Sequence, residues 1–363
     1  MADGQAPPSG LTTSRREVLR RVAAGLALVP ILKNIALAGG ARKPAPAFLR
    51  GVALAGAEFG QLVPGQFGRE YTYPGSADFA FCVAQGFNAV RLPFKWERLQ
   101  PSLGQPFDTV EWSRLATAIG TARKTGLSLI LDPHNYARRR VRDDNFTAEH
   151  LIGSDLVPVA AFVAFWRELA GRCKSDAHVI FGLMNEPADF AARTWLDIAN
   201  LTLAAIRQTG AQQLVLIPGT AYTGAHSWIE AGNTVLEAVE DPAGNFAIEV
   251  HQYLDKDSSG TSGPAVSDSI GSERLQAFQR WARARSLKAF LGEFGAGSDT
   301  TSLRALDNIV HEVENNRDVW IGWTAWAAGP WWPDSEPLRL SPDKAGGIPP
   351  QTQLLSGFAR AKP

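Results

Sequence analysis

From position 48 onward, short apolar runs alternate with longer stretches in which apolar residues recur at helical spacing. The runs predict buried strands, because parallel strands covered on both faces are apolar throughout. Eight runs have this form, at 51–56, 89–92, 128–131, 179–183, 214–217, 247–250, 287–291 and 319–324. Helical spacing predicts amphipathic helices between most of them, at 110–125, 157–172, 191–209, 272–285 and 301–315.

Eight strands that alternate with helices predict an α/β fold, a single-domain (β/α)8 TIM barrel over residues 48–363. The chain has 363 residues, which suits one barrel of about 250 residues with insertions. No linker divides this region, and the Ser/Gly-rich stretch 257–269 is expected to be a loop between a strand and a helix.

The first 38 residues have the pattern of a twin-arginine export signal. Ser14-Arg15-Arg16-Glu17-Val18-Leu19 precedes a modestly apolar run at 22–32 and the small-x-small site Ala36-Leu37-Ala38. The run is too short to span a bilayer. We expect cleavage near Gly39, a short linker at 39–47, and a periplasmic or secreted protein without stable membrane association. A membrane anchor and a disordered basic tail are the alternatives.

Charge and composition favour a neutral partner. Lys plus Arg and Asp plus Glu both total 36, so no net charge attracts nucleic acid or an anionic membrane. Eleven Trp residues suit sugar rings, which pack on flat aromatic surfaces. Cys82 falls in a further helical pattern at 78–85, and Cys173 directly follows the pattern at 158–172, so both cysteines are expected to be buried free thiols. We expect a monomer.

Polar residues follow the predicted strands where barrel enzymes place their chemistry, at the carboxyl ends. The run at 179–183 is followed by Asn185 and Glu186, and the run at 287–291 by Glu293. Further candidates at such ends are Arg91, His134, His251, Tyr253 and Trp326.

Two carboxylates at the ends of separate strands suit hydrolysis of a glycosidic bond, which needs one carboxylic acid and one carboxylate. Arg91 would keep Glu293 ionised, while burial and the negative neighbour would raise the pKa of Glu186. Tyr253 and His251 could then hydrogen-bond the nucleophile Glu293. His134 and Asn185 are suited to contact sugar hydroxyls. This chemistry needs no cofactor and no metal.

The motifs at these strand ends resemble glycoside hydrolase family 5, the cellulase-type barrels of clan A. They are Arg91-Leu92-Pro93-Phe94, Asp132-Pro133-His134-Asn135-Tyr136, Asn185-Glu186-Pro187, His251-Gln252-Tyr253-Leu254-Asp255 and Gly292-Glu293-Phe294-Gly295. Leu54-Ala55-Gly56-Ala57-Glu58-Phe59 and the stretch 251–263 resemble the endo-β-1,4-glucanases of its subfamily 5.

The resemblance implies that Glu186 is the acid/base and Glu293 the nucleophile of a retaining enzyme that acts on a β-glucan polysaccharide. It places Arg91, His134, Asn185, His251 and Tyr253 in the active site and makes Trp326 a sugar platform. Trp96, Trp228, Trp331 and Trp332 are further candidates for outer sugar subsites. Fungal members of this group carry disulfides and often a cellulose-binding module. Since neither is recognised here, soluble or amorphous β-1,4-glucan is the expected substrate, with mixed-linkage glucan second.

Three alternatives differ in class or substrate. A metal-dependent barrel hydrolase could use Asp132, His134, His251 and Glu293 as ligands, although the sequence lacks the paired-histidine spacing typical of such sites. A carbohydrate-binding barrel without activity would have no use for the two carboxylates. A β-mannanase or xyloglucanase of the same family would use the same two glutamates.

Overall fold

The computed structural model describes residues 47–142 and 147–361. Within them, eight parallel strands close into a barrel, in the order β1-β10-β9-β8-β7-β6-β3-β2. This confirms the predicted fold. The strands are β1 (Leu49–Leu54), β2 (Ala89–Phe94), β3 (Ser128–Pro133), β6 (Val179–Gly182), β7 (Val215–Pro218), β8 (Phe246–His251), β9 (Ala289–Glu293) and β10 (Trp320–Ala328). The predicted export signal, 1–38, and nearly all of the predicted linker, 39–47, lie outside the described residues.

Apolar side chains fill one end of the barrel. Seven strands each contribute one buried residue to a single cluster, which consists of Leu49, Ala89, Ile130, Ile180, Leu216, Ala247 and Phe290. Two positions further along β2, β3 and β8 stand Arg91, Asp132 and Glu249. Because side chains alternate along a strand, these polar groups point to the same side as the cluster, one layer closer to the carboxyl ends.

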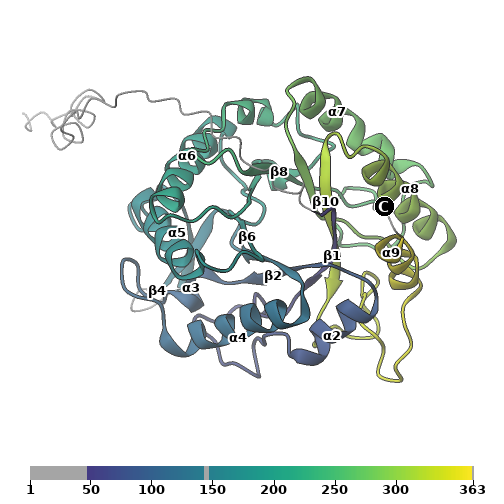
Figure 1. The fold of residues 1–363 in the computed structure, drawn as a ribbon, viewed down its shortest axis with the longest axis horizontal. Helices are drawn as coiled ribbons and strands as arrows, with labels where there is room; N and C mark the ends of the chain where they lie inside the picture. The colour runs from purple at the N-terminus through teal and green to yellow at the C-terminus, as the bar shows by residue number, and fades with distance from the viewer. Residues whose placement is uncertain (1–46, 143–146, 362–363) are drawn as a thin grey trace, which may run out of the picture. The chain divides into compact units, whose positions relative to one another are not determined.

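Helices surround the strands (Figure 1). Their apolar faces are buried against the strands. They are α2 (Ser76–Ala84), α4 (Thr109–Thr125), α5 (Val159–Cys173), α6 (Ala192–Gln208), α7 (Ile270–Ala284) and α8 (Thr300–Asn315). In α8 the buried positions recur every three or four residues, from Ser302 to Val313. Asp299 begins this helix by accepting a hydrogen bond from the Ser302 amide at 3.0 Å. Cys82 and Cys173 are buried free thiols, as predicted.

Four features were not predicted. A two-stranded antiparallel hairpin, β4 (Arg138–Arg142) and β5 (Thr147–Leu151), follows β3. A short helix α3 (Trp96–Leu99) follows β2. Between β7 and β8 the described chain has the 3-10 segments η2 (Ala221–Thr223) and η3 (Asn233–Ala238). The last helix, α9 (Pro350–Arg360), completes the described elements.

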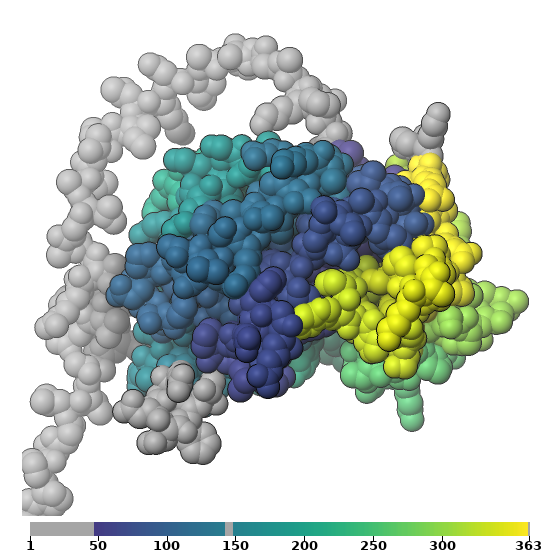
Figure 2. Space-filling model, turned by 90° about the horizontal axis from the view of Figure 1, so that it is seen from below, coloured from purple at the N-terminus to yellow at the C-terminus, as the bar shows by residue number. Residues whose placement is uncertain are grey.

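The C-terminal helix packs beside the first helix of the barrel. The Ser356 hydroxyl donates to the Gln85 side chain at 2.9 Å, and the Arg360 guanidinium donates to the Ala84 carbonyl at 2.7 Å. Figure 2 shows the yellow C-terminal segment against the dark blue N-terminal part of the barrel. Among the described residues, none of the helices combines the length and the apolar character that crossing a bilayer requires.

Candidate active site

The carboxyl ends of β2, β3, β6, β8 and β9 bring the predicted polar residues together. Arg91 contacts Glu293, and its Nη2 donates to the Asn185 side chain at 2.8 Å. Glu186 follows Asn185 and has a left-handed backbone, with φ of 41°. This conformation is uncommon for a residue other than glycine and concentrates at functional sites.

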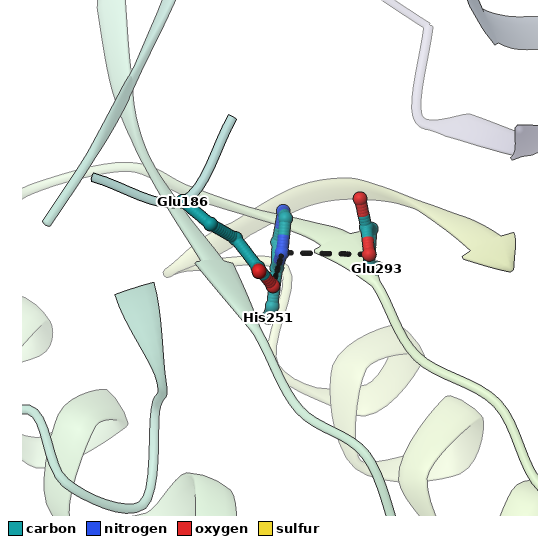
Figure 3. A group of neighbouring side chains, drawn as sticks. All are labelled: Glu186, His251 and Glu293. Carbon is teal, nitrogen blue, oxygen red and sulfur yellow. Dashed lines mark hydrogen bonds and ion pairs between the residues drawn. The ribbon is translucent and has the colours of Figure 1, made fainter. Parts of the chain in front are cut away.

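His251 lies between the two glutamates (Figure 3). Its Nδ1 hydrogen-bonds Glu186 Oε1 at 2.7 Å and lies 3.7 Å from Glu293 Oε2. One carboxylate oxygen of each glutamate and a nitrogen of His251 all lie within 4.8 Å of one another. His251 therefore contacts Glu293 at ion-pair distance, as expected, but its hydrogen bond goes to Glu186 and not to Glu293.

Positive neighbours keep Glu293 ionised despite its burial. Burial raises the pKa of this carboxyl, but the charges of His251 and Arg91 outweigh burial, and they hold the pKa at about 2. Tyr253 donates a hydrogen bond to Glu293 Oε2 at 2.7 Å and also lowers its pKa. Glu293 is thus an ionised carboxylate with both oxygens engaged.

Glu186 has the opposite tendency. Burial raises its pKa above the ordinary value, and the negative charge of Glu293 adds to this effect, while His251 opposes it. The two carboxyls are close, yet their environments drive their pKa values apart. Opposite shifts of this kind are the pattern expected of a pair in which one carboxyl serves as an acid and the other as a base.

A second group of side chains completes the site. His134 Nδ1 contacts Asp132 Oδ2 at 2.9 Å, and its Nε2 lies 3.3 Å from the Asn185 side-chain nitrogen. Asp132 Oδ2 also lies 3.1 Å from Arg91. The ring of Trp326, on β10, stacks on His134 with a centroid distance of 5.4 Å.

A pocket of about 440 Å³ opens beside His134 and Trp326. Its other walls come from the segment after β1, from Lys95, and from the β4–β5 hairpin with Arg138 and Arg140. The structure thus brings all eight predicted site residues to one end of the barrel, where a pocket adjoins them.

Glu249 is a site residue that the sequence analysis missed. It lies within β8, is 1% exposed, and its Oε1 is 3.4 Å from His251 Nε2 and 3.5 Å from Arg91 Nε. The available signal was alternation along the strand, since Glu249 and His251 are two residues apart and must share a face. Strand ends alone do not reveal such a residue.

Two tryptophans proposed for outer sugar subsites are core residues. Trp96 packs against Phe162 and Phe165, and Trp228 packs against Phe278 and Trp281. Both indoles are fully buried, so neither can form a sugar platform, and these two predictions are wrong.

The other two tryptophans are accessible. Trp331 is 38% exposed, and Trp332 is partly buried with its ring edge-on to Trp326. These two remain candidates for outer subsites.

The group formed by Glu186, His251 and Glu293 fits a metal ion poorly. The 2.7 Å contact between His251 and Glu186 is a hydrogen bond. The guanidinium of Arg91 already contacts Glu293 and supplies the cation that this carboxylate requires. We therefore derive no metal-dependent step from these residues.

Known proteins share both the sequence and the fold. Residues 50–329 match the family model of cellulase, glycosyl hydrolase family 5. The chain is 36% identical over 287 residues to the endoglucanase gh5-1 of Neurospora crassa, a match that covers 78% of this chain and 70% of the relative.

Solved structures agree with this relationship. An endo-β-1,4-glucanase of Xanthomonas axonopodis pv. citri superimposes with a TM-score of 0.81 at 43% identity, covering 86% of this chain and 98% of that one. The endoglucanase Cel5A of Pseudomonas stutzeri, in complex with cellobiose, gives a TM-score of 0.77 at 32% identity, covering 86% and 92%. Because the family model matches most of the barrel and the relatives have this degree of similarity, the chain belongs to glycosyl hydrolase family 5.

Proposed function

We propose that the protein is an endo-acting, retaining β-1,4-glucanase that cleaves internal bonds of soluble or amorphous β-glucan as a monomer. The observation that carries the proposal is the pair Glu186 and Glu293, whose oxygens lie within 4.8 Å and whose pKa values shift in opposite directions. Carboxyl groups about 5–5.5 Å apart are typical of retaining glycosidases, and a larger gap of about 6.5–9.5 Å would leave room for an attacking water.

In the first step Glu293 attacks the anomeric carbon. The bond to the leaving oxygen breaks, a bond from Glu293 to carbon forms, and Glu186 gives its proton to the leaving oxygen. In the second step Glu186 takes a proton from water, the water oxygen bonds to the anomeric carbon, and Glu293 departs. Arg91 and Tyr253 hold the carboxylate of Glu293 in position for attack through their contacts with its two oxygens.

His134, Asn185 and Trp326 are proposed to bind the sugar. The amide and the imidazole contact each other at 3.3 Å, and together they present polar atoms beside the two carboxyls. Trp326 lines the adjoining pocket and offers an aromatic surface to a sugar ring. The related enzyme that binds cellobiose supports a β-1,4-linked glucan as the substrate.

Glu293→Gln tests the nucleophile. We expect hydrolysis of carboxymethylcellulose to fall by at least about 10⁴-fold, because an amide cannot form the covalent intermediate, while cellotetraose binding measured by calorimetry persists. Normal turnover by the variant would refute the assignment. The anomeric configuration of the first product, followed by NMR on cellotetraose, distinguishes retention from inversion.

Glu186→Ala tests the acid. Substrates with very good leaving groups need no protonation, so their hydrolysis should survive best. Equal losses on 2,4-dinitrophenyl β-cellobioside and on cellotetraose would contradict the role.

Chelation with EDTA should leave the wild-type rate unchanged, which tests the metal-dependent alternative. Product profiles on mannan and xyloglucan, beside carboxymethylcellulose and mixed-linkage glucan, test the family's other specificities.

We further propose that residues 1–38 direct export by the twin-arginine route and are then removed, leaving residues 48–363 as the catalytic domain. The motif at Ser14-Arg15-Arg16-Glu17 supports this proposal. Replacing Arg15 and Arg16 with Lys should retain activity in the cytoplasm of a host that exports the wild type. N-terminal sequencing of the exported protein should begin near Gly39, and an intact Met1 there would count against cleavage.

A further inference from the structure

Both ring nitrogens of His251 face a carboxylate. Nδ1 is 2.7 Å from Glu186 Oε1, and Nε2 is 3.4 Å from Glu249 Oε1. A carboxylate oxygen can only accept, so a ring that donates to both must carry a proton on each nitrogen. A neutral imidazole has one N–H, so it satisfies both contacts only if Glu186 Oε1 carries the acid proton and donates it to Nδ1. In that state the acid proton is held against the ring and is not presented to a leaving group.

Glu249 is built into the floor of the site. Its Oε1 lies between two basic side chains, 3.4 Å from His251 Nε2 and 3.5 Å from Arg91 Nε. The neighbouring strand makes room for it, because a Cβ at Gly292 would overlap Glu249 Oε1. Gly292 directly precedes Glu293. The absence of a side chain at this position leaves room for the carboxylate of Glu249 next to that of Glu293.

We infer that Glu249 is a positioning residue that keeps His251 as an imidazolium and so directs the acid proton of Glu186 to Oε2, the oxygen that His251 does not contact. The imidazolium donates to Glu186 Oε1, which must then be the accepting oxygen. The proton of the carboxylic acid is left on Oε2, where it can pass to the leaving group. This inference rests on the proposed function of Glu186.

The imidazolium also favours loss of that proton. Once Glu186 has protonated the leaving oxygen, its new negative charge stands beside a positive ring. The titratable groups that face the ring are Glu186 after β6, Glu249 on β8 and Glu293 on β9. Arg91 on β2 pairs with Glu249 and Glu293. Although burial lowers the pKa of His251, the charge of Glu293 and the hydrogen bonds to Glu186 and Glu249 outweigh burial and raise it to about 10.

The protonation state of His251 can be measured directly in the wild type. The full chain, labelled with ¹⁵N-histidine, is titrated by NMR, and His251 is assigned by the signal lost in His251→Asn. We expect both nitrogens to remain protonated from pH 5 to pH 8. A single neutral tautomer at pH 7 would overturn the inference, whether or not any variant folds.

Glu249→Gln tests the consequence for catalysis. The amide keeps the shape of the side chain but removes the charge, so His251 should lose a proton at lower pH than in the wild type. We expect kcat/KM on cellotetraose to fall about 10–100-fold and on 2,4-dinitrophenyl β-cellobioside by less than about threefold, because only the poor leaving group needs the acid. Equal losses on both substrates, or an unchanged His251 titration, would contradict the role.

Glu314→Gln is the matched control. Glu314 is a largely buried glutamate on α8 that pairs with Arg50 at 2.7 Å. It makes its contacts away from the two catalytic candidates. This variant should keep the wild-type ratio of the two rates and the wild-type His251 titration. A changed ratio would show that loss of any buried ion pair alters it, which would contradict a specific role of Glu249. If the wild type failed to hydrolyse cellotetraose, the proposed function would fail, whereas the NMR titration would still decide the state of His251.

Discussion

Glu293 and Glu186 are chemically identical, and their neighbours alone separate them. Arg91 and Tyr253 contact Glu293 directly, while the hydrogen bond to Glu186 comes from His251. Moving a carboxyl from water into a protein interior disfavours its charge, so a nucleophile in this position needs compensation from several donors. At the scale of single residues, the unequal distribution of these donors shifts the two pKa values in opposite directions, as the proposed acid and nucleophile require.

Removing one donor should weaken the nucleophile measurably. Tyr253→Phe deletes the 2.7 Å hydrogen bond to Glu293 Oε2 and little else. Hydrogen bonds to charged groups contribute about 1.5–3 kcal/mol, which predicts a fall in kcat/KM of about 10–100-fold. Because this bond lowers the pKa of Glu293, its loss raises that pKa, and the acidic limb of the pH–rate profile should move to higher pH. A profile that falls uniformly without moving would contradict this account.

The candidate residues at strand ends were predictable because a barrel has one chemically active rim. Residue type did not show which tryptophans face a cleft, and Trp96 and Trp228 proved to be core residues. Residue type also did not reveal Glu249. The proposed role of this residue depends on its contact with His251 and on the absence of a side chain at Gly292 on the neighbouring strand β9. Contacts between strands are a property of register, which a single sequence does not display.

At the scale of elements, the loop after β8 acts as a support for Tyr253. Asp255 accepts hydrogen bonds from the Gly260 and Ser262 amides, each at 3.2 Å, and this folds the loop back over the ring. A Cβ on Gly260 would lie 2.5 Å from the Tyr253 ring. The loop therefore fixes the tyrosine that donates to Glu293, and glycine is required where the two meet.

Gly260→Ala should reduce activity by displacing this ring. We expect kcat to fall about tenfold or more, consistent with a misplaced hydrogen bond to a charged group, and we expect little further loss when Tyr253→Phe is added. The control is Gly104→Ala, since Gly104 has the same φ of 72° but no atom within 4 Å of the position that a Cβ would occupy. Both substitutions place a Cβ on a backbone with positive φ, so both incur similar backbone strain. Equal effects on kcat would show that contact with Tyr253 is irrelevant.

The elements that were predicted share a clear hydrophobic pattern, and those that were missed lack one. All eight barrel strands and five of the surrounding helices lie within a few residues of their predicted positions. The hairpin strand β4 is rich in arginine and depends on tertiary contacts, such as the stacking of Arg139 on Trp96. The 3-10 segments η2 and η3 stand between β7 and β8, where no helix was predicted because the sequence there has no long amphipathic stretch.

At the scale of the whole molecule, buried ion pairs tie the outer helices to the barrel. Arg50 on β1 makes two bonds to Glu314 on α8, at 2.7 and 2.8 Å. Arg207 on α6 makes two bonds to Asp241, at 2.8 and 2.9 Å, near the start of β8. Each pair joins segments far apart in the sequence, so loss of the charge on either acid should loosen the packing of the barrel wall.

Because of these ion pairs, we expect the free energy of unfolding to fall in acid. Burial raises the pKa of Asp241, but the hydrogen bonds from Arg207 outweigh it and lower the pKa below its ordinary value. A carboxyl whose pKa is lower in the folded state adds stability above its unfolded pKa, about 3.9, and this stability is lost as the pH falls through the folded value. Asp241→Asn should therefore destabilise the protein by about 3–5 kcal/mol at pH 7, and by less as the pH falls through the folded pKa of Asp241.

Calorimetric unfolding of the wild type and of Asp241→Asn at pH 7, 4 and 2.5 measures this difference. The gap between the two melting temperatures should narrow as the pH falls, because the wild type loses the charge that the variant already lacks. Asp268→Asn is the control, since Asp268 pairs with Arg304 at the surface, where both side chains are at least half exposed and such pairs contribute little. A gap that stays constant with pH would mean that Asp241 stabilises the fold through its shape and not through its charge.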